Sequence, residues 1–428
     1  MPDPEHVDQP LESAHDPYAV LRNRDLVLYL VGRFIASMGQ QMLTVAIGWE
    51  LYERTHKPLN LGLVGLTQMI PMILFTLPAG HVADNHDRKK IIIAMTFVIA
   101  CASTVLALIS FWKLPVGWIY AALFAAGTAR TFLWPASSAF MPQLVSRQDF
   151  SNAVTWSSGS FQLSSVAGPA ASGALIALTH HAVWVYLINM VAALICLAMI
   201  SFVRSRHVIA IREKMTPANL IAGFEFVFAN RIILGTITLD LFAVLLGGAT
   251  ALLPVYAKDI LLAGTGGFKF LQSDAARLGL LQAALPAGSF LCAVWLAHRR
   301  PLQRAGHTLL WAVSIFGLGT IAFGFSRWFW FSFAMLFLCG FVDNVSVVVR
   351  HTLVQLLTPD EKRGRVSAVN SLFIGTSNEL GGFESGFVAQ LFTPVISVVS
   401  GGIGTLIVVL GVGWIWPEIR KYGRLDAS

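Results

Sequence analysis

Eight ionisable side chains interrupt long apolar stretches of the chain, where charge is unexpected. They are Arg33, Glu50, Arg130, Asp240, Asp343, Arg350, Glu379 and Glu384. A charge surrounded by hydrocarbon is costly, so it must face water or an opposite charge. In such surroundings ionisable residues carry protons, bind substrates or form buried ion pairs. These eight residues are the first candidates for chemistry in this sequence.

The carboxylates among them differ in depth within their apolar stretches. Asp343 and Glu379 lie closest to the middle of a stretch. The predicted proton-coupling candidates are Asp343, Glu379, Asp240 and Glu384, and the predicted cavity cations are Arg130 and Arg33. A permanent ion pair across the cavity and the binding of a cationic substrate are the two alternative interpretations. Glu50 and Arg350 lie near the ends of their stretches, so we expect them to reach the membrane–water interface.

Uncharged polar residues in the same stretches predict the wall of a binding cavity. The substrate-contacting candidates are Gln40, Gln41, Ser157, Gln162 and Asn378. Aromatic residues are plentiful beside them, and a mixed polar and aromatic cavity suits a bulky amphiphilic molecule. Most individual residues in such a set are expected to be packing contacts.

Searches for other chemistry find no further site. The sequence contains no phosphate-binding Walker loop, so direct use of ATP is not expected. The four cysteines lie singly in apolar stretches and are expected to be small buried hydrophobes. His180 and His181 lack a third ligand, so no metal site, cofactor or enzymatic activity is predicted.

The elements that position these residues are membrane-spanning helices. Only 12% of the 428 residues are charged and 55% are apolar, against roughly 25% charged in soluble domains. About twelve stretches are long enough to cross a bilayer as helices. They cover 26–52, 59–82, 91–111, 116–140, 151–178, 182–203, 232–256, 275–297, 308–325, 328–354, 366–391 and 395–416. The prediction is an all-α membrane protein of twelve transmembrane helices in two six-helix halves.

The loops between these stretches predict the domain organisation and the topology. The expected parts are an N-terminal tail (1–25), a first half (26–203), a linker (204–231), a second half (232–417) and a C-terminal tail (418–428). About two thirds of the 30 Lys and Arg residues fall on the side of the termini. This bias predicts cytoplasmic termini in a multi-pass protein of the bacterial inner (plasma) membrane. It also explains the basic charge without a nucleic-acid partner.

The two halves repeat each other in sequence. Leu61-Gly62 opens the second stretch as Leu278-Gly279 opens the eighth, and Ser172-Gly173 of the fifth matches Ser385-Gly386 of the eleventh. Each match pairs one stretch with the stretch six places later. A parallel repeat of this kind predicts a substrate site near the midplane, between the halves.

The loop between the second and third stretches carries a family signature. It reads GHVADNHDRKK from Gly80 to Lys90 and resembles the major facilitator superfamily motif G-x-L-A-D-R-x-G-R-[KR]. Gly80, Asp84, Arg88 and Lys89 match that motif. The resemblance implies a conformational latch that holds the cytoplasmic side closed and releases during transport. A local ion pair between Asp84 and Arg88 is the alternative interpretation.

Further motifs resemble one branch of this superfamily. Gly168, Pro169 and Gly173 in the fifth stretch are similar to the antiporter motif of drug:proton antiporters. Together with Gly32, Met38, Gly39 and Pro142, they resemble the branch that holds macrolide-efflux and enterobactin-exporter-like proteins. Arg130 matches the fourth-helix arginine of better-known exporters, although Trp134 occupies the position where they have glycine.

This resemblance implies a monomeric secondary transporter in the lipid bilayer. It would export a small amphiphilic molecule, such as a drug or siderophore, in exchange for protons by alternating access. In the fold so implied, the third, sixth, ninth and twelfth helices are peripheral, and these four stretches carry none of the eight charges. A lipid or lysolipid flippase, an importer and a non-transporting sensor are the alternatives.

Overall fold

The computed structural model describes residues 18–146, 148–204, 224–262, 267–299 and 304–423, which are nearly all helical. The helices of the first half are α1 (Arg24–Thr55), α2 (Pro58–Asn85), α3 (Arg88–Phe111), α4 (Gly117–Phe140), α5 (Phe150–Thr179) and α6 (Val183–Phe202). The second half contains α8 (Arg231–Leu246), α10 (Asp274–Ala297), α11 (Ala305–Phe325), α12 (Phe329–Leu357), α13 (Asp360–Leu391), α14 (Pro394–Ile415) and the short α15 (Pro417–Lys421). Most of the predicted linker, most of the predicted N-terminal tail and residues 424–428 of the predicted C-terminal tail lie outside the described residues.

Within the described residues, twelve long helical segments therefore stand where twelve were predicted. Ten of those in the described residues are long and apolar enough to cross a membrane, and α4 and α13 are the two that fall below this criterion. The sequence of α13 contains many glycine, serine and charged residues, because this helix of the second half faces α2 of the first half rather than lipid alone. The predicted ends agree with the observed ends within a few residues for most helices.

The seventh segment is the exception, because it is interrupted. After α8, the chain forms a 3-10 turn, η3 (Ala249–Leu252), then the short α9 (Leu253–Val255) and the π-helical turn η4 (Tyr256–Ile260). A side chain at Gly248 would lie 2.5 Å from the backbone oxygen of Gly381, so α8 ends where the chain passes closely beside α13. The interruption places η3 and α9 at the centre of the molecule.

Helix ends follow from local sequence. The Asn23 side chain accepts hydrogen bonds from the backbone nitrogens of Asp25 and Leu26 at 3.0 and 3.3 Å, which fixes the start of α1. Asp87 similarly accepts from the backbone nitrogen of Lys89 and begins α3. His180 ends α5 in the left-handed conformation, with φ at 58°.

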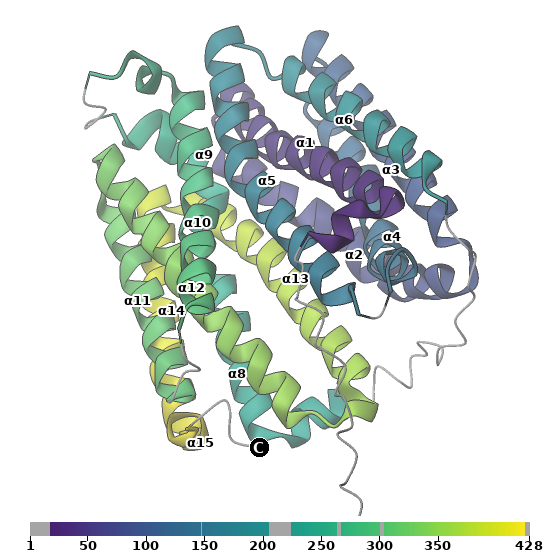
Figure 1. Cartoon of the computed structure of the whole chain (residues 1–428). Helices are drawn as coiled ribbons and strands as arrows, with labels where there is room; N and C mark the ends of the chain where they lie inside the picture. The colour runs from purple at the N-terminus through teal and green to yellow at the C-terminus, as the bar shows by residue number, and fades with distance from the viewer. Residues whose placement is uncertain (1–17, 147, 205–223, 263–266, 300–303, 424–428) are drawn as a thin grey trace, which may run out of the picture.

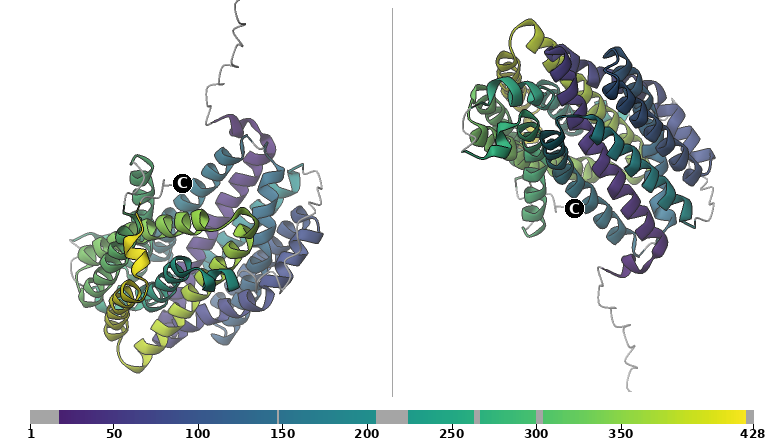
Figure 2. Two further views of the ribbon diagram at one scale, coloured as in Figure 1. Left: turned by 90° about the horizontal axis from the view of Figure 1, so that it is seen from below. Right: turned by 90° about the horizontal axis from the view of Figure 1, so that it is seen from above.

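The two halves lie side by side and meet through two helix pairs (Figure 1). α2 packs against α13, and α5 packs against α10, which joins the second helix to the eleventh and the fifth to the eighth. The views from both ends keep the first six helices and the later helices mainly on opposite sides (Figure 2). We call the end where α1 begins and α14 ends the terminal face, and the opposite end the far face.

The contacts between halves concentrate toward the far face, at the repeated glycines. A side chain at Gly386 of α13 would lie 2.7 Å from the Cα atom of Gly62 in α2. A side chain at Gly173 of α5 would lie 2.8 Å from the Cα atom of Gly279 in α10. The predicted repeat is therefore visible in space, because its matching residues bring the helix backbones together.

Helices α3, α6, α11 and α14 form the periphery. They carry large exposed apolar side chains, including Phe97, Trp311 and Trp414, as expected of surfaces that face lipid. Cys101 of α3 is exposed as well, contrary to the expectation that all four cysteines are buried. The other three cysteines are buried as expected.

Candidate transport cavity

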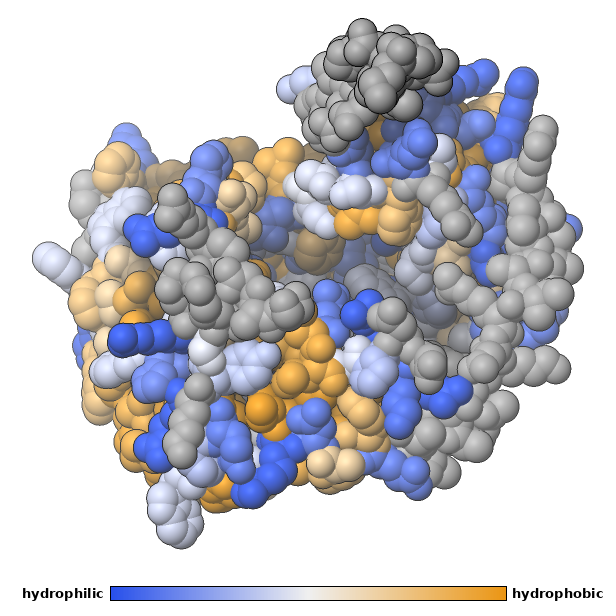
Figure 3. Space-filling view, turned by 60° about the horizontal axis from the view of Figure 1, so that its bottom comes forward, coloured by the Kyte–Doolittle hydropathy of each residue, from blue (hydrophilic) through white to orange (hydrophobic). Residues whose placement is uncertain are grey.

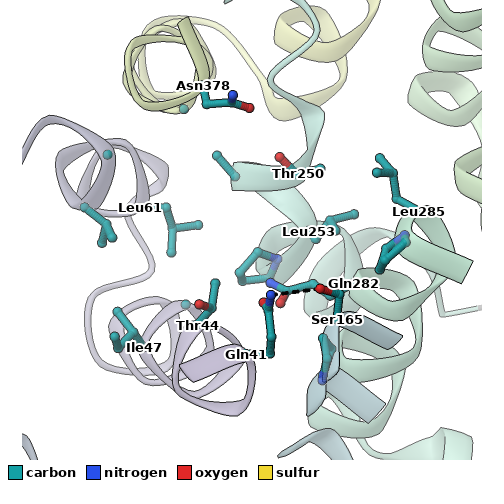
Figure 4. A pocket seen from close by; sticks show the side chains of 18 of the residues that line it. Gln41, Thr44, Ile47, Leu61, Ser165, Thr250, Leu253, Gln282, Leu285 and Asn378 are labelled. Carbon is teal, nitrogen blue, oxygen red and sulfur yellow. Dashed lines mark hydrogen bonds between the residues drawn. The ribbon is translucent and has the colours of Figure 1, made fainter. Parts of the chain in front are cut away.

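A cavity of about 730 Å³ lies between the two halves (Figure 4). Its wall comes from α1, α2, α4 and α5 on one side, and from η3, α9, α10, α12 and α13 on the other. The polar residues that line it are Gln40, Gln41, Thr44, Gln68, Arg130, Ser165, Thr250, Gln282, Asn378 and Glu379. None of the described lining residues belongs to α3, α6, α11 or α14, in agreement with the predicted peripheral helices.

Gly168, one of the residues that resemble the antiporter motif, positions one wall of this cavity. Gly168 brings α5 close to α1, because a side chain there would lie 2.6 Å from the Cβ atom of Gln41. At this approach the Gln41 side-chain nitrogen donates a hydrogen bond of 3.1 Å to the Ser165 hydroxyl (Figure 4). Pro169 lines the cavity directly, and Gly173 contacts α10 nearer the far face. Gly168 thus packs α5 against α1 within the first half, and Pro169 and Gly173 lie where α5 meets α10 of the second half.

Two of the predicted charges face this cavity from opposite halves. Arg130 comes from α4 and Glu379 from α13, and each charge lies within electrostatic range of the other. They form no ion pair within 4 Å in the described part of the chain. Gly65 of α2 leaves room for Glu379, because any side chain at position 65 would collide with the backbone oxygen of Glu379.

A second group of charges is enclosed within the second half. Arg350 of α12 forms a hydrogen-bonded ion pair with Asp240 of α8, and these residues are only 2% and 6% exposed. Asp343 lies within electrostatic range of both. None of these three residues lines the transport cavity. The expectation that Arg350 reaches the membrane interface is wrong, because α12 continues to Leu357 and keeps this arginine inside the bundle.

Glu50 is also buried rather than placed at the interface. It accepts a hydrogen bond of 2.7 Å from the Tyr186 hydroxyl and pairs with Arg54 at 3.2 Å. Both partners belong to the first half, so this carboxylate joins α1 to α6 within one half.

The remaining predicted residues lie outside the cavity lining. Glu384 accepts a hydrogen bond of 3.4 Å from the neighbouring Ser385 hydroxyl. Arg33 lies within electrostatic range of Tyr29 and Cys196 in the first half. Gln162 donates to the Pro286 backbone oxygen at 2.7 Å, so it joins α5 to α10. Ser157 is partly buried on α5 and is not part of the described lining.

The signature loop between α2 and α3 is bound to its own half. Arg88 donates to the backbone oxygens of Ala83 and Ala139 at 3.3 and 3.2 Å. Lys89 donates to those of Ser201 and Val203 at 2.8 and 2.9 Å, at the end of α6. Gly80 lies in the last turns of α2.

Asp84, the acidic residue of the loop, is not engaged in the same way. It forms no hydrogen bond or ion pair with another described residue, and in particular no pair with Arg88. Because Arg88 is committed to backbone oxygens, it is not the local partner of Asp84.

Polar contacts that the sequence did not predict close the far face. The Tyr52 hydroxyl donates to Asp259, Lys258 pairs with Glu53, and the Trp49 ring nitrogen donates to Asp274 at 3.3 Å. With the Gln162 contact, these are the four polar links between the halves among the described residues. Viewed from the terminal face, the molecule is hollowed between the halves (Figure 3).

Sequence reasoning missed Gln68, Thr250 and Gln282 in the lining. A single amide in an otherwise apolar stretch, as at Gln68 and Gln282, is the signal that points to them. No group of three or more His, Cys, Asp or Glu side chains suited to a metal ion occurs within the described ranges.

Comparison with known proteins agrees with this architecture. A family model described as transmembrane secretion effector matches residues 15–419. The enterobactin exporter EntS of Escherichia coli is 24% identical over 400 residues, covering 92% of this chain and 92% of that protein. The protein of the same name from Shigella boydii gives the same identity and coverage.

Solved structures match over nearly the whole chain. A mutant of the peptide transporter POT in complex with sulfate superposes with a TM-score of 0.72 at 11% identity, covering 96% of this chain and all of that one. A bacterial homologue of the human lysosomal transporter Spinster, in an inward-facing and occupied conformation, gives 0.68 at 13% identity, covering 95% and 98%. At these identities the likeness concerns the fold alone. The chain belongs to the transmembrane secretion effector family and is a multi-pass membrane transporter of the major facilitator superfamily.

Proposed function

We propose that this transporter exports a small amphiphilic molecule in exchange for protons, by alternating access through the central cavity. The observation that carries the proposal is the placement of Arg130 and Glu379 on opposite halves of one cavity. Ionised Glu379 attracts Arg130 and favours approach of the halves, and protonation removes that attraction. Proton uptake thereby changes both the substrate site and the relative stability of the two conformations.

The proposed orientation places the terminal face in the cytoplasm of a bacterial cell and the far face outside its inner membrane. The excess of Lys and Arg in the loops of the terminal face supports this orientation. In it, the cavity receives its substrate from the cytoplasm while the far-face contacts keep the outside closed. Export then requires these contacts to open and the terminal face to close.

Asp84 is the proposed latch for that closure. Its carboxylate has no described partner while the terminal face is hollowed, and Arg88 and Lys89 hold its loop rigidly on α4 and α6. When the halves close on this face, a helix N-terminus or a cation of the second half would receive the carboxylate. The latch would therefore bind only in the outward-open conformation.

The proposed coupling carboxylate is Glu379 rather than Asp343, Asp240 or Glu384. Glu379 lines the cavity and interacts with a charge on the other half. Asp240 is already neutralised by Arg350, and both belong to the same half as Asp343. We assign these three residues to holding α8 against α12.

The proposed substrate is a hydrogen-bonding molecule such as the siderophore named for the relatives. The amides of Gln40, Gln41, Gln68, Gln282 and Asn378 offer both donors and acceptors within the cavity. The cavity volume of about 730 Å³ is in the range that encloses drug-sized ligands.

The experiment that tests this function is enterobactin accumulation in cells that make it and lack their own exporter. Expression of this chain should lower the intracellular amount, and an uncoupler of the proton gradient should abolish the decrease. An unchanged amount would contradict this substrate, and a decrease that survives the uncoupler would contradict proton coupling.

A further inference from the structure

Two basic pockets open at equivalent places of the two halves on the terminal face. The first, of about 700 Å³, lies between the start of α3 and the end of α6. The second, of about 530 Å³, lies between the start of α11 and the segment after α14. In the twofold repeat, α11 corresponds to α3 and α14 corresponds to α6. The same position of the fold is therefore hollow and cationic in both halves.

The first pocket presents exposed cations, and the carboxylates near it already accept hydrogen bonds. Arg24, Lys90 and Arg204 line it and are exposed. The nearby carboxylates are engaged by backbone nitrogens: Asp87 accepts from the nitrogen of Lys89, and Asp25 from that of Arg204 at 3.0 Å. Positive charge is thus available for an incoming anion.

The second pocket is built by the C-terminal segment. Ile419 of α15 is fully buried, and the backbone oxygens of Tyr422 and Gly423 accept from the first nitrogens of α11. The pocket is lined by exposed Arg304, His307 and Arg420, with no carboxylate among its described lining residues. The adjacent Glu418 is paired with Arg231 at 3.1 Å, away from these cations.

Apolar side chains adjoin both groups of cations. Phe202 lines the first pocket and is 69% exposed. Trp414 and Ile415, which end α14 beside the second pocket, are 82% and 48% exposed. Exposed rings at a helix end are typical of the membrane–water interface. Each pocket therefore combines a site for a phosphate with a neighbouring surface for acyl chains.

We propose that each pocket binds the phosphate headgroup of one anionic phospholipid of the leaflet at the terminal face. Arg and Lys side chains at this depth attract anionic headgroups, and basic pockets between transmembrane helices recognise them. The lipids would bridge α3 to α6 and α11 to α15. This inference concerns lipid binding alone and does not depend on the proposed substrate or on proton coupling.

The test is native mass spectrometry of the full chain released from bilayers of equal phosphatidylglycerol and phosphatidylcholine. Wild type is expected to retain two phosphatidylglycerol molecules in preference to phosphatidylcholine. Lys90→Gln with Arg204→Gln should lose one, Arg304→Gln with Arg420→Gln should lose the other, and the quadruple variant should lose both. Each double variant should bind its lipid about thirtyfold more weakly.

The matched control is Lys113→Gln with Lys269→Gln, which removes two exposed cations near the far face. This control should retain both lipids, and all variants should elute as folded protein at the wild-type position. Equal lipid loss in the control, or unchanged lipid counts in both double variants, would overturn the proposal. Displacement of the lipids by millimolar inorganic phosphate would instead assign the pockets to a free anion and would also overturn it.

Discussion

At the scale of residues, the two groups of buried charge differ in whether they span the halves. Asp240 and Arg350 both belong to the second half, so their ion pair moves with that half as one body. Glu379 and Arg130 come from different halves, so their separation would change in the proposed alternating-access movement. Only a charge pair whose two members lie on different halves links protonation of its carboxylate directly to the relative position of the halves.

Glu379→Gln tests this link, because it keeps the size of the side chain and removes its charge. Proton-driven export should fall to the level of cells without the protein, while exchange of labelled for unlabelled substrate continues. Glu384→Gln changes the same helix outside the cavity lining and should retain proton-driven export. Loss of export in Glu384→Gln alone would move the coupling role to that residue.

Arg350→Gln tests the structural role of the enclosed pair. Removing the arginine leaves Asp240 charged and buried beside Asp343, so the free energy of unfolding should fall by about 3–5 kcal/mol. Neutralising both partners, by Asp240→Asn with Arg350→Gln, should recover part of that loss. Denaturation in detergent micelles measures these changes. Equal losses in the single and double variants would contradict this account, because they would mean that the unpaired Asp240 charge costs nothing.

At the scale of elements, the helices were predictable and their long-range partners were not. Hydropathy set the ends of most helices, because crossing a bilayer requires a long apolar stretch. The glycines at positions 62, 173, 279 and 386 occupy equivalent positions in the two halves of the sequence repeat. In the structure, position 62 lies against 386 and position 173 lies against 279. The charges at Glu53, Lys258 and Asp259 resembled ordinary loop charges, since sequence does not give their partners on the other half.

Gly173→Val tests the close approach of α5 and α10. A side chain there would lie 2.6 Å from the Ala275 backbone oxygen, so the far face should be unable to close. Spin labels on Lys113 and Lys269, on loops of opposite halves, should shift to longer distances in electron resonance measurements. Gly159→Val changes the same helix where no neighbour lies within 4 Å, and its distances should stay at wild-type values. A shift in both variants would show a general disturbance of α5.

At the scale of the whole molecule, the far-face contacts differ greatly in strength. The Lys258–Glu53 pair is 23% and 45% exposed at its side chains, and pairs of this kind contribute about 1 kcal/mol or less. The helix crossings at the glycines therefore provide most of the free energy that keeps the far face closed, and the polar contacts add a smaller contribution. Weak far-face contacts suit the proposed transport cycle, because the far-closed and far-open conformations must both be populated during one cycle.

Lys258→Met is accordingly expected to shift the population of far-closed molecules only a few-fold, whereas Gly173→Val removes that population. The same spin-label distances measure both effects, and high salt should weaken the difference between Lys258→Met and wild type. A complete loss of the far-closed population in Lys258→Met would contradict this ranking.

The conformation itself was beyond prediction from sequence. The two conformations of the proposed alternating-access cycle would share one sequence and one set of helices, so hydropathy and motifs describe them equally well. The cavity lining was predicted in part, through Gln40, Gln41, Arg130, Asn378 and Glu379. Glu384 and Ser157 fell outside it, because helix rotation about its own axis decides which residues face the centre.

Proton-driven export through the central cavity is tested most directly in proteoliposomes that contain only this protein. Enterobactin uptake into vesicles is measured with an imposed proton gradient that is acidic inside, alongside the Glu379→Gln variant. Uptake should exceed its equilibrium level in wild type, fall to that level when the gradient is collapsed, and remain there in Glu379→Gln. Equal accumulation by Glu379→Gln under the same gradient would contradict the assignment of proton coupling to this carboxylate.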